Sequence, residues 1–182
     1  LSLIDDSSAL MVVGLIPVTR HLELLSRYKD ETDEAVWSSI IGDLHFFDRY
    51  VGKDERKAYQ KFAQAQLANV FARLGWDGKE NESTQLRQLR ASVIGALGTI
   101  GQDQSVIAEA RKRFAGYLKD RTSLDRDLLS PVSTIVAYNG QKSDYEEFRK
   151  LSKMAPTPEI RVRNLFVLDE FQSPELVAKT LD

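Results

Sequence analysis

The chain has 182 residues, 25 of them basic and 27 acidic, so its formal net charge is −2 at pH 7. Hydrophobic residues make up 42% and charged residues 29%, which is typical of a soluble globular protein and excludes a disordered or collagen-like chain. Cysteine is absent, which excludes disulfides, thiolate zinc sites and cysteine nucleophiles.

The beginning of the sequence predicts neither a membrane span nor a secretory signal. Its longest apolar run, Ala9 to Val18, contains Gly14 and Pro17 and is shorter than the roughly 18–20 residues that a span needs. A signal peptide would begin with basic residues, whereas Asp5 and Asp6 occupy this region. We therefore expect no membrane as a partner.

Helical periodicity dominates the chain, and no stretch alternates like a β-strand. The clearest apolar face is formed by Leu86, Leu89, Val93, Ile94, Leu97 and Ile100. Ser83 or Thr84 is positioned to cap the beginning of this helix and Gly101 to end it. Taken in order, the predicted helices span residues 2–14, 17–28, 33–49, 55–74, 84–100, 104–119, 125–138, 143–153, 158–171 and 174–182.

Three prolines refine these boundaries. Thr157 and Ser173 each precede a proline, which is the pattern of an N-cap followed by proline at the first helical position. Pro131 lies inside the seventh predicted helix, and we expect it to kink or restart that helix.

Ten short helices with short connections predict an all-α fold. Consecutive helices joined by short loops pack antiparallel, and pairs recur about every 35–50 residues, as in HEAT or armadillo arrays. We expect a superhelical stack of antiparallel helix pairs that forms one helical domain over residues 1–182. An irregular helical bundle is the competing interpretation. Because the first residue is Leu1 rather than methionine, we expect the chain to be a fragment of a larger protein.

The sequence offers no recognisable catalytic or metal centre. A helical zinc site needs two histidines one turn apart and a third ligand, whereas this chain has only His21 and His45. We expect both to face solvent or cap helices. Asp5 and Asp6 interrupt an apolar helix face, so we expect at least one to be partly buried and hydrogen bonded to a neighbouring helix or paired with a base.

Basic residues gather locally between positions 111 and 126. They are Arg111, Lys112, Arg113, Lys119, Arg121 and Arg126, interspersed with acidic residues. Such a pattern is typical of a solvated helix face. With a net charge of −2, we expect no nucleic acid partner.

A set of short motifs is spread along the chain. The segments are Leu3–Asp6 with Ala9–Leu10, Glu31–Trp37, Leu74–Trp76, Leu89–Ala91 with Ala96–Leu97 and Gly101, Glu109–Ala110 with Phe114, Arg163–Phe171, and Pro174–Leu176. Together they resemble the C-terminal helical domain of M1-family zinc aminopeptidases, a group that contains puromycin-sensitive aminopeptidase and the antigen-trimming enzymes of the endoplasmic reticulum. Their order and spacing extend over nearly the whole chain.

The resemblance implies a non-catalytic domain that closes over a separate catalytic domain and walls the peptide cavity. Family members remove N-terminal residues from peptides with zinc and a water nucleophile, and their His-Glu-x-x-His motif is absent here. We therefore expect no cofactor and no activity in this chain, with zinc in the parent enzyme. The implied partners are the parent's catalytic domain and peptide substrates.

The resemblance also places three positions at possible contacts with substrate or structure. Asp5, Asp6 and Arg90 fall in family motifs, and Arg90 is expected either to face the cavity or, preferably, to pair with a neighbouring helix. Antigen-trimming members hold the peptide C-terminus with a Tyr-Lys pair and an Arg. The corresponding positions here are Phe47–Asp48 and Glu170, whose acidic side chains cannot pair with a carboxylate.

Three further expectations concern the chain's setting. A free-standing HEAT-like scaffold for protein partners is the alternative function, and an upstream His-Glu-x-x-His would decide between the two. We expect a cytoplasmic location, with which the absence of cysteine is compatible. Apolar residues near the end of the chain predict an exposed patch and self-association through the last helices; they are Leu165, Phe166, Leu168, Phe171, Leu176, Val177 and Leu181.

Overall fold

The computed structural model describes residues 2–181, which form α-helices, short 3₁₀ turns and loops, with no β-strand in that range. The chain divides into two compact units, one ending at Asp103 and the other beginning at Gln104. Ten α-helices are present among the described residues, which confirms the all-α prediction. The superhelical stacking of helix pairs stays a prediction.

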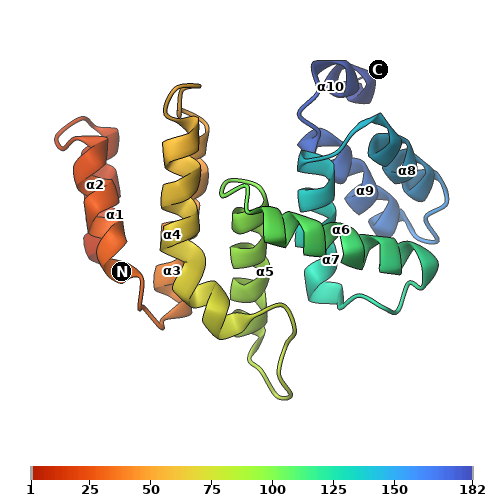
Figure 1. Cartoon of the computed structure of the whole chain (residues 1–182), viewed down its shortest axis with the longest axis horizontal. Helices are drawn as coiled ribbons and strands as arrows, with labels where there is room; N and C mark the ends of the chain where they lie inside the picture. Colours follow the sequence, from red (N-terminus) through yellow and green to blue (C-terminus); the bar gives the residue numbers. More distant parts are fainter. Residues whose placement is uncertain (1, 182) are drawn as a thin grey trace. The chain divides into compact units, whose positions relative to one another are not determined.

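The first unit contains five α-helices and one 3₁₀ turn (Figure 1). They are α1 (Ser2–Val12), α2 (Val18–Leu25), η1 (Ser26–Tyr28), α3 (Glu34–Asp48), α4 (Arg56–Leu74) and α5 (Thr84–Gly98). Helix α3 packs against α1 and α5, and α4 packs against α5. Helix α3 is the centre of this core because Trp37, Ile40 and Leu44, three to four residues apart on one face, are fully buried.

The second unit contains the other five α-helices and a second 3₁₀ turn. They are α6 (Gln104–Lys119), α7 (Arg126–Tyr138), α8 (Lys142–Lys153), α9 (Pro158–Phe166), η2 (Val167–Glu170) and α10 (Pro174–Leu181). Helix α6 packs on α7, α8 packs on α9, and η2 contacts α7, α8, α9 and α10.

Aromatic side chains fill the core of the second unit. The ring of Phe148 lies 4.8 Å from that of Phe114 and 6.2 Å from that of Phe171, measured between centroids. Phe171 also meets Tyr145 edge to face at 5.3 Å. Gly140, in the loop after α7, makes room for Phe171, since a Cβ there would lie 2.6 Å from the Phe171 ring.

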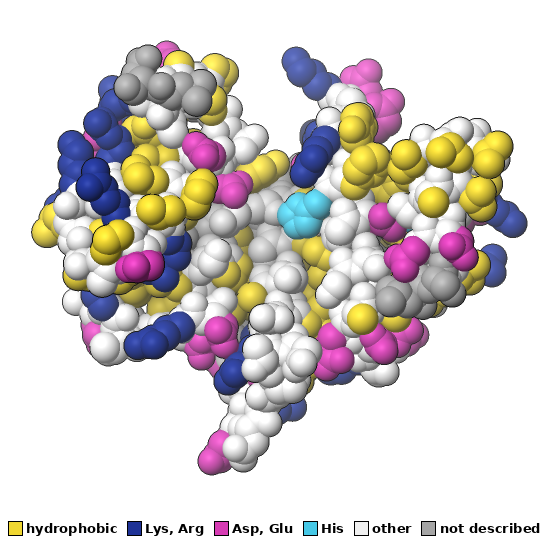
Figure 2. Space-filling view, turned by 180° about the vertical axis from the view of Figure 1, so that it is seen from behind, with side chains coloured by type: hydrophobic (Ala, Val, Ile, Leu, Met, Phe, Trp, Pro, Cys, Tyr) yellow, Lys and Arg dark blue, Asp and Glu magenta, His cyan; other side chains and the backbone are white. Residues whose placement is uncertain are grey.

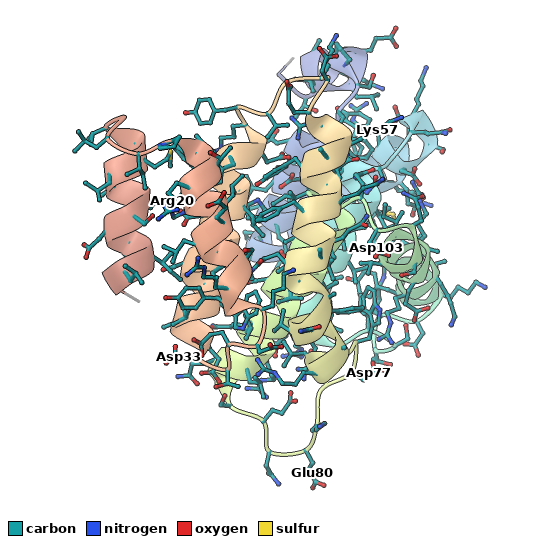
Figure 3. All side chains as sticks on the ribbon, turned by 60° about the vertical axis from the view of Figure 1, so that its left-hand side comes forward. Arg20, Asp33, Lys57, Asp77, Glu80 and Asp103 are labelled. Carbon is teal, nitrogen blue, oxygen red and sulfur yellow. The ribbon has the colours of Figure 1, made fainter. Side chains whose placement is uncertain are left out.

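Side chains at the helix beginnings explain where several helices start. Asp33 accepts hydrogen bonds from the backbone N–H groups of Ala35 and Val36 and caps α3, at whose beginning Figure 3 shows it. Figure 3 also shows Glu80 at the tip of the loop between α4 and α5. The predicted caps Ser83 and Thr157 are confirmed, each accepting from the backbone N–H three residues later.

The structure differs from the prediction in four of the helices. Helix α5 ends at Gly98, before Gly101, which lies in the following turn and accepts a hydrogen bond on its carbonyl from Gln64. Helix α7 continues through Pro131, so of the two expected effects the restart is wrong, and the kink stays a prediction. The predicted helices 17–28 and 158–171 each end in a 3₁₀ turn, which tightens the last turn where α-helical hydrogen bonds run out. No helix between residues 2 and 181 combines the length and the apolar character that a bilayer span requires.

Candidate functional site

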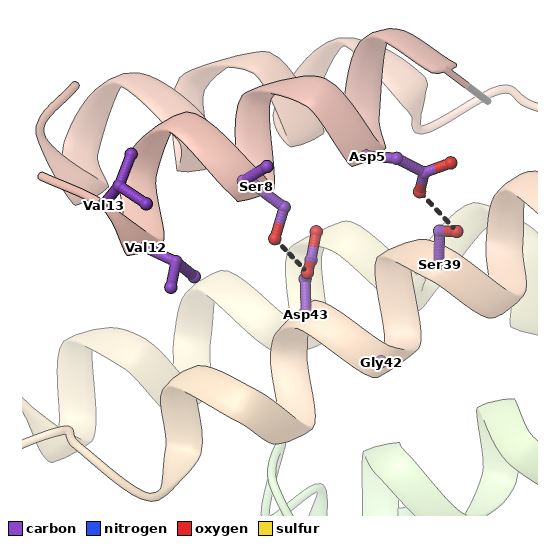
Figure 4. Close-up of a pocket in the computed structure, with 8 residues that line it drawn as sticks. Asp5, Ser8, Val12, Val13, Ser39, Gly42 and Asp43 are labelled. Atoms are coloured by element: carbon purple, nitrogen blue, oxygen red, sulfur yellow. Dashed lines mark hydrogen bonds between the residues drawn. The ribbon is translucent and has the colours of Figure 1, made fainter. Parts of the chain in front are cut away.

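A shallow groove between α1 and α3 contains one of the residues singled out from the sequence (Figure 4). Its walls are Asp5, Ser8, Ala9 and Val12 of α1, Val13 in the turn after it, and Ser39, Gly42 and Asp43 of α3. Two hydrogen bonds cross between the helices. Ser39 Oγ donates to Asp5 Oδ1 at 3.1 Å, and Ser8 Oγ donates to Asp43 Oδ1 at 3.0 Å.

The expected burial of Asp5 or Asp6 is wrong, because both carboxylates are exposed. Helix α1 buries only the face that carries Ile4, Ser7 and Met11, and the two aspartates lie off that face. The expected hydrogen bond from a neighbouring helix is present for Asp5, which accepts from α3.

His21 is neither solvent-facing nor a cap, contrary to the expectation from the sequence, since its side chain is fully buried on α2. Its Nε2 lies 2.8 Å from Asp43 Oδ2 and its Nδ1 lies 2.9 Å from Ser7 Oγ. A carboxylate only accepts, so Nε2 donates to Asp43, while Nδ1 forms the hydrogen bond with the Ser7 hydroxyl. The spacing to Leu25, one turn on and also fully buried, is the sequence signal that places His21 on an inward face.

This serine, histidine and aspartate network holds three helices together rather than presenting a nucleophile. Ser7 and His21 do not line the groove between α1 and α3; of the network, only Asp43 reaches it, beside Ser8. A catalytic serine needs an approachable hydroxyl and nearby donors for an oxyanion. Here Ser7 is buried and its hydroxyl is used by the imidazole. The arrangement therefore satisfies buried polar groups at the junction of α1, α2 and α3.

Arg90 lies inside the first unit, with 3% of its surface exposed. Its two terminal nitrogens donate to the two carboxylate oxygens of Glu82 at 2.6 and 2.5 Å. Its Nε donates to the backbone carbonyl of Leu74 at 3.2 Å. The guanidinium thus ties the loop before α5 to the end of α4, and its hydrogen bonds hold the pKa of Glu82 below its usual range.

The described residues contain no group of three or more histidine, aspartate and glutamate side chains that could hold a metal ion. His45 is exposed on α3, as expected, and His21 has both nitrogens engaged. The residues present therefore do not fit a zinc centre of the histidine type that the resemblance implies for the parent.

The positions that correspond to the C-terminus clamp of the antigen-trimming enzymes have other roles here. Phe47 is buried in the first unit, and Asp48 pairs with Arg56, which also donates to the Asp48 and Val51 carbonyls. In the second unit, Glu170 is half-buried, and desolvation, with a smaller effect of the Asp169 charge, raises its pKa. Neither position supplies a cation for a peptide carboxylate.

Each unit also exposes apolar side chains. Figure 2 shows such side chains gathered over the α1 and α2 region, on the right of the view. Leu15, in the turn between the two helices, is 72% exposed, and Val12 and Val13 are also exposed. In the second unit Phe166 is 67% exposed. Of the residues expected to form a patch at the end of the chain, Leu165, Phe166 and Val177 are exposed, Leu168, Phe171 and Leu176 are buried, and the side chain of Leu181 lies outside the described residues.

Comparisons with known proteins agree with the resemblance. The ERAP1-like C-terminal domain family matches residues 1–182. The alanine/arginine aminopeptidase of Saccharomyces cerevisiae is 27% identical over 184 residues, which cover 98% of this chain and 21% of that protein. Aminopeptidase M1 of Arabidopsis thaliana is 29% identical over 189 residues, which cover 99% of this chain and 21% of that protein. Aminopeptidase M1-A of Oryza sativa subsp. japonica is 28% identical over 190 residues, which cover 98% of this chain and 21% of that protein. The chain therefore spans about a fifth of the length of these curated relatives.

Proposed function

Because the chain belongs to the family of ERAP1-like C-terminal domains, we propose that it is the non-catalytic C-terminal part of an M1-family zinc aminopeptidase. In this proposal it covers the active site and shapes the cavity that receives peptide substrates. The observation that carries the proposal is the unbroken family match from residue 1 to residue 182, joined to relatives that are all called aminopeptidases and are about five times longer.

The hydrogen bonds of two buried polar side chains support a structural, non-catalytic role for this chain. Arg90 donates hydrogen bonds to Glu82 and Leu74, and His21 is hydrogen bonded to Ser7 and Asp43. Zinc in the parent would supply the polarising charge and the activated water for peptide hydrolysis. This chain would supply walls that exclude bulk water and limit which peptides enter.

The exposed apolar residues around the α1–α2 turn support packing against another part of the parent protein. Val12, Val13 and Leu15 are exposed together, and a contiguous apolar surface of this kind marks an interface in soluble proteins. We assign this surface to contact with the catalytic part of the parent. Burying it would stabilise a closed cavity by the removal of apolar area from water.

The test is to compare the parent enzyme with and without this segment. Its coding sequence is first read for an upstream His-Glu-x-x-His motif, whose absence would overturn the proposal in favour of a free-standing scaffold. Steady-state hydrolysis of an aminoacyl-arylamide is then measured beside hydrolysis of peptides of three to twelve residues. We expect the deletion to change the dependence on peptide length more than the arylamide rate.

A surface variant sharpens this test. Replacing Val13 and Leu15 by aspartate in the full parent places two charges on the proposed contact, and the length dependence should shift toward that of the deletion. Tyr50→Asp is the matched control, because Tyr50 is 73% exposed in the same unit but lies outside the α1–α2 region. Equal length dependence in the wild type, the deletion and the double variant would refute the proposed role.

A further inference from the structure

A second groove lies entirely within the second unit, between the end of α6, the beginning of α7, α8 and α9. Figure 1 shows the end of α6 and the loop from α8 to α9 on the same side of this unit, at the right of the view. The groove encloses about 810 Å³, within the range of cavities that hold small molecules or short peptide segments. It is lined by Tyr117, Leu118, Arg121, Leu124, Arg126, Leu129, Glu147, Lys150, Leu151, Met154, Ala155, Pro156, Ile160, Arg163 and Asn164.

The charges around this groove are unbalanced. Arg121, Arg126, Lys150 and Arg163 line it, against the single carboxylate of Glu147. Within residues 2–181 none of these four cations forms an ion pair, and Arg121 instead lies over the ring of Tyr117 at 4.6 Å.

Several other cations of the same unit are paired with carboxylates, unlike the four that line the groove. Arg111 faces Asp144, Arg113 faces Glu109, and Arg149 faces Glu146. The basic run seen in the sequence is therefore divided by the fold. Its first part is neutralised within the unit, whereas Arg121 and Arg126 join Lys150 and Arg163 around one cavity. Converging unpaired cations in a concave site favour an anionic ligand.

The rest of the lining is apolar, which narrows the class of anion. Leucine and isoleucine side chains line the cavity with Met154, which is 71% exposed and adaptable in shape. Tyr117 is the single aromatic residue of the lining, and its ring already carries Arg121. A nucleotide base would therefore have at most one ring to stack on among these residues, and Arg121 already lies over it, whereas aliphatic peptide side chains would find a matching surface.

We propose that this groove binds an acidic peptide segment that alternates carboxylate and apolar side chains. Arginine forks pair with carboxylates through two parallel hydrogen bonds, and the apolar lining buries the side chains between them. This inference goes beyond the proposed function and concerns the 182-residue chain alone, so it stands or falls independently of any aminopeptidase activity of the parent.

Binding is tested with the 182-residue chain and fluorescein-labelled hexapeptides, by fluorescence anisotropy at 0.15 M salt. The probe alternates glutamate with leucine, one matched peptide replaces each glutamate by glutamine, and another replaces each leucine by glycine. We expect both replacements to weaken binding at least tenfold. Tripolyphosphate serves as a competitor that carries similar charge without apolar groups, and it should compete at least tenfold less well than the unlabelled probe peptide.

Charge reversal in the groove is the decisive variant. The double variant R126E/K150E should weaken binding of the glutamate–leucine probe at least tenfold. The control K153E/R161E makes the same change of net charge at exposed positions of α8 and α9 whose side chains do not line the groove, and it should alter affinity less than threefold. Circular dichroism confirms the helical content of both variants.

Three results would overturn the proposal. The first is equal weakening by the groove variant and the control, which would show a diffuse charge effect. The second is equal binding of the glutamate and glutamine peptides, which would remove carboxylates from recognition. The third is tripolyphosphate competing as strongly as the peptide, which would assign the groove to phosphorylated small molecules.

Discussion

Replacing Arg90 by methionine should strongly destabilise the first unit. Methionine keeps much of the side-chain length but removes every donor, which leaves the Glu82 carboxylate and the Leu74 carbonyl without their partner. The Glu82 side chain is only 7% exposed, so water replaces the lost hydrogen bonds poorly. Removing one member of a buried ion pair costs about 3–5 kcal/mol. This is a large share of the roughly 5–15 kcal/mol that stabilises a typical domain.

Urea unfolding followed by tryptophan fluorescence is the assay, because both tryptophans, Trp37 and Trp76, lie in the first unit. A loss of about 3–5 kcal/mol corresponds to a midpoint shift of about 1.5–2.5 M for a slope near 2 kcal/mol/M. The control is Arg73→Met, an exposed change on α4 that should cost less than about 0.5 kcal/mol. The double variant R90M/E82L should recover a large part of the loss, because it removes the stranded carboxylate.

The pH dependence of the same pair provides an independent check. Hydrogen bonds from Arg90 lower the pKa of Glu82 in the folded state, so the pair stabilises the fold above the ordinary glutamate pKa. That contribution is lost as the pH falls through the lowered folded-state value. The stability difference between wild type and R90M should therefore shrink in acid. A loss below about 1 kcal/mol at pH 7, or a double variant no more stable than R90M, would refute a structural role for Arg90.

Three other changes test the remaining interactions. Asp43→Asn removes the carboxylate that accepts from His21 and Ser8 and should cost about 1–3 kcal/mol, measured by tryptophan fluorescence in urea; an unchanged midpoint would contradict a stabilising network. Glu170→Gln should stabilise the second unit at pH 7 by up to about 1 kcal/mol, because burial raises the pKa of Glu170 and makes its charge costly. This gain should vanish below the ordinary glutamate pKa, where both side chains are neutral. Thermal unfolding followed by circular dichroism at pH 7 and pH 3.5 measures both effects. Phe166→Ser removes an exposed aromatic ring of α9 and should reduce the self-association that we expect, as measured by light scattering over a concentration series. A wild-type chain that stays monomeric over the whole series would contradict that expectation.

The helices could be predicted from local sequence because their causes are local. Ser83 and Thr157 cap helices with their own side chains, Gly75 adopts a positive φ at the end of α4, and Pro174 begins α10. The continuation of α7 through Pro131 could be learned only from the structure, because whether a helix tolerates an internal proline depends on its packing as well as on propensity. The family resemblance likewise rests on motifs that can be read along the chain.

Side-chain partnerships between helices were decided by the tertiary structure. Composition gives no means of telling that His21 would be enclosed by Ser7 and Asp43, 14 and 22 residues away, because burial depends on which helix faces meet. Asp5 shows the converse, since a carboxylate beside an apolar face became exposed when α1 buried only one narrow stripe. The cations at positions 121 and 163 are far apart in the sequence and share one groove only because α6 to α9 fold together. Helix formation follows short-range hydrogen bonding and capping, whereas sites arise from long-range packing that no local pattern encodes.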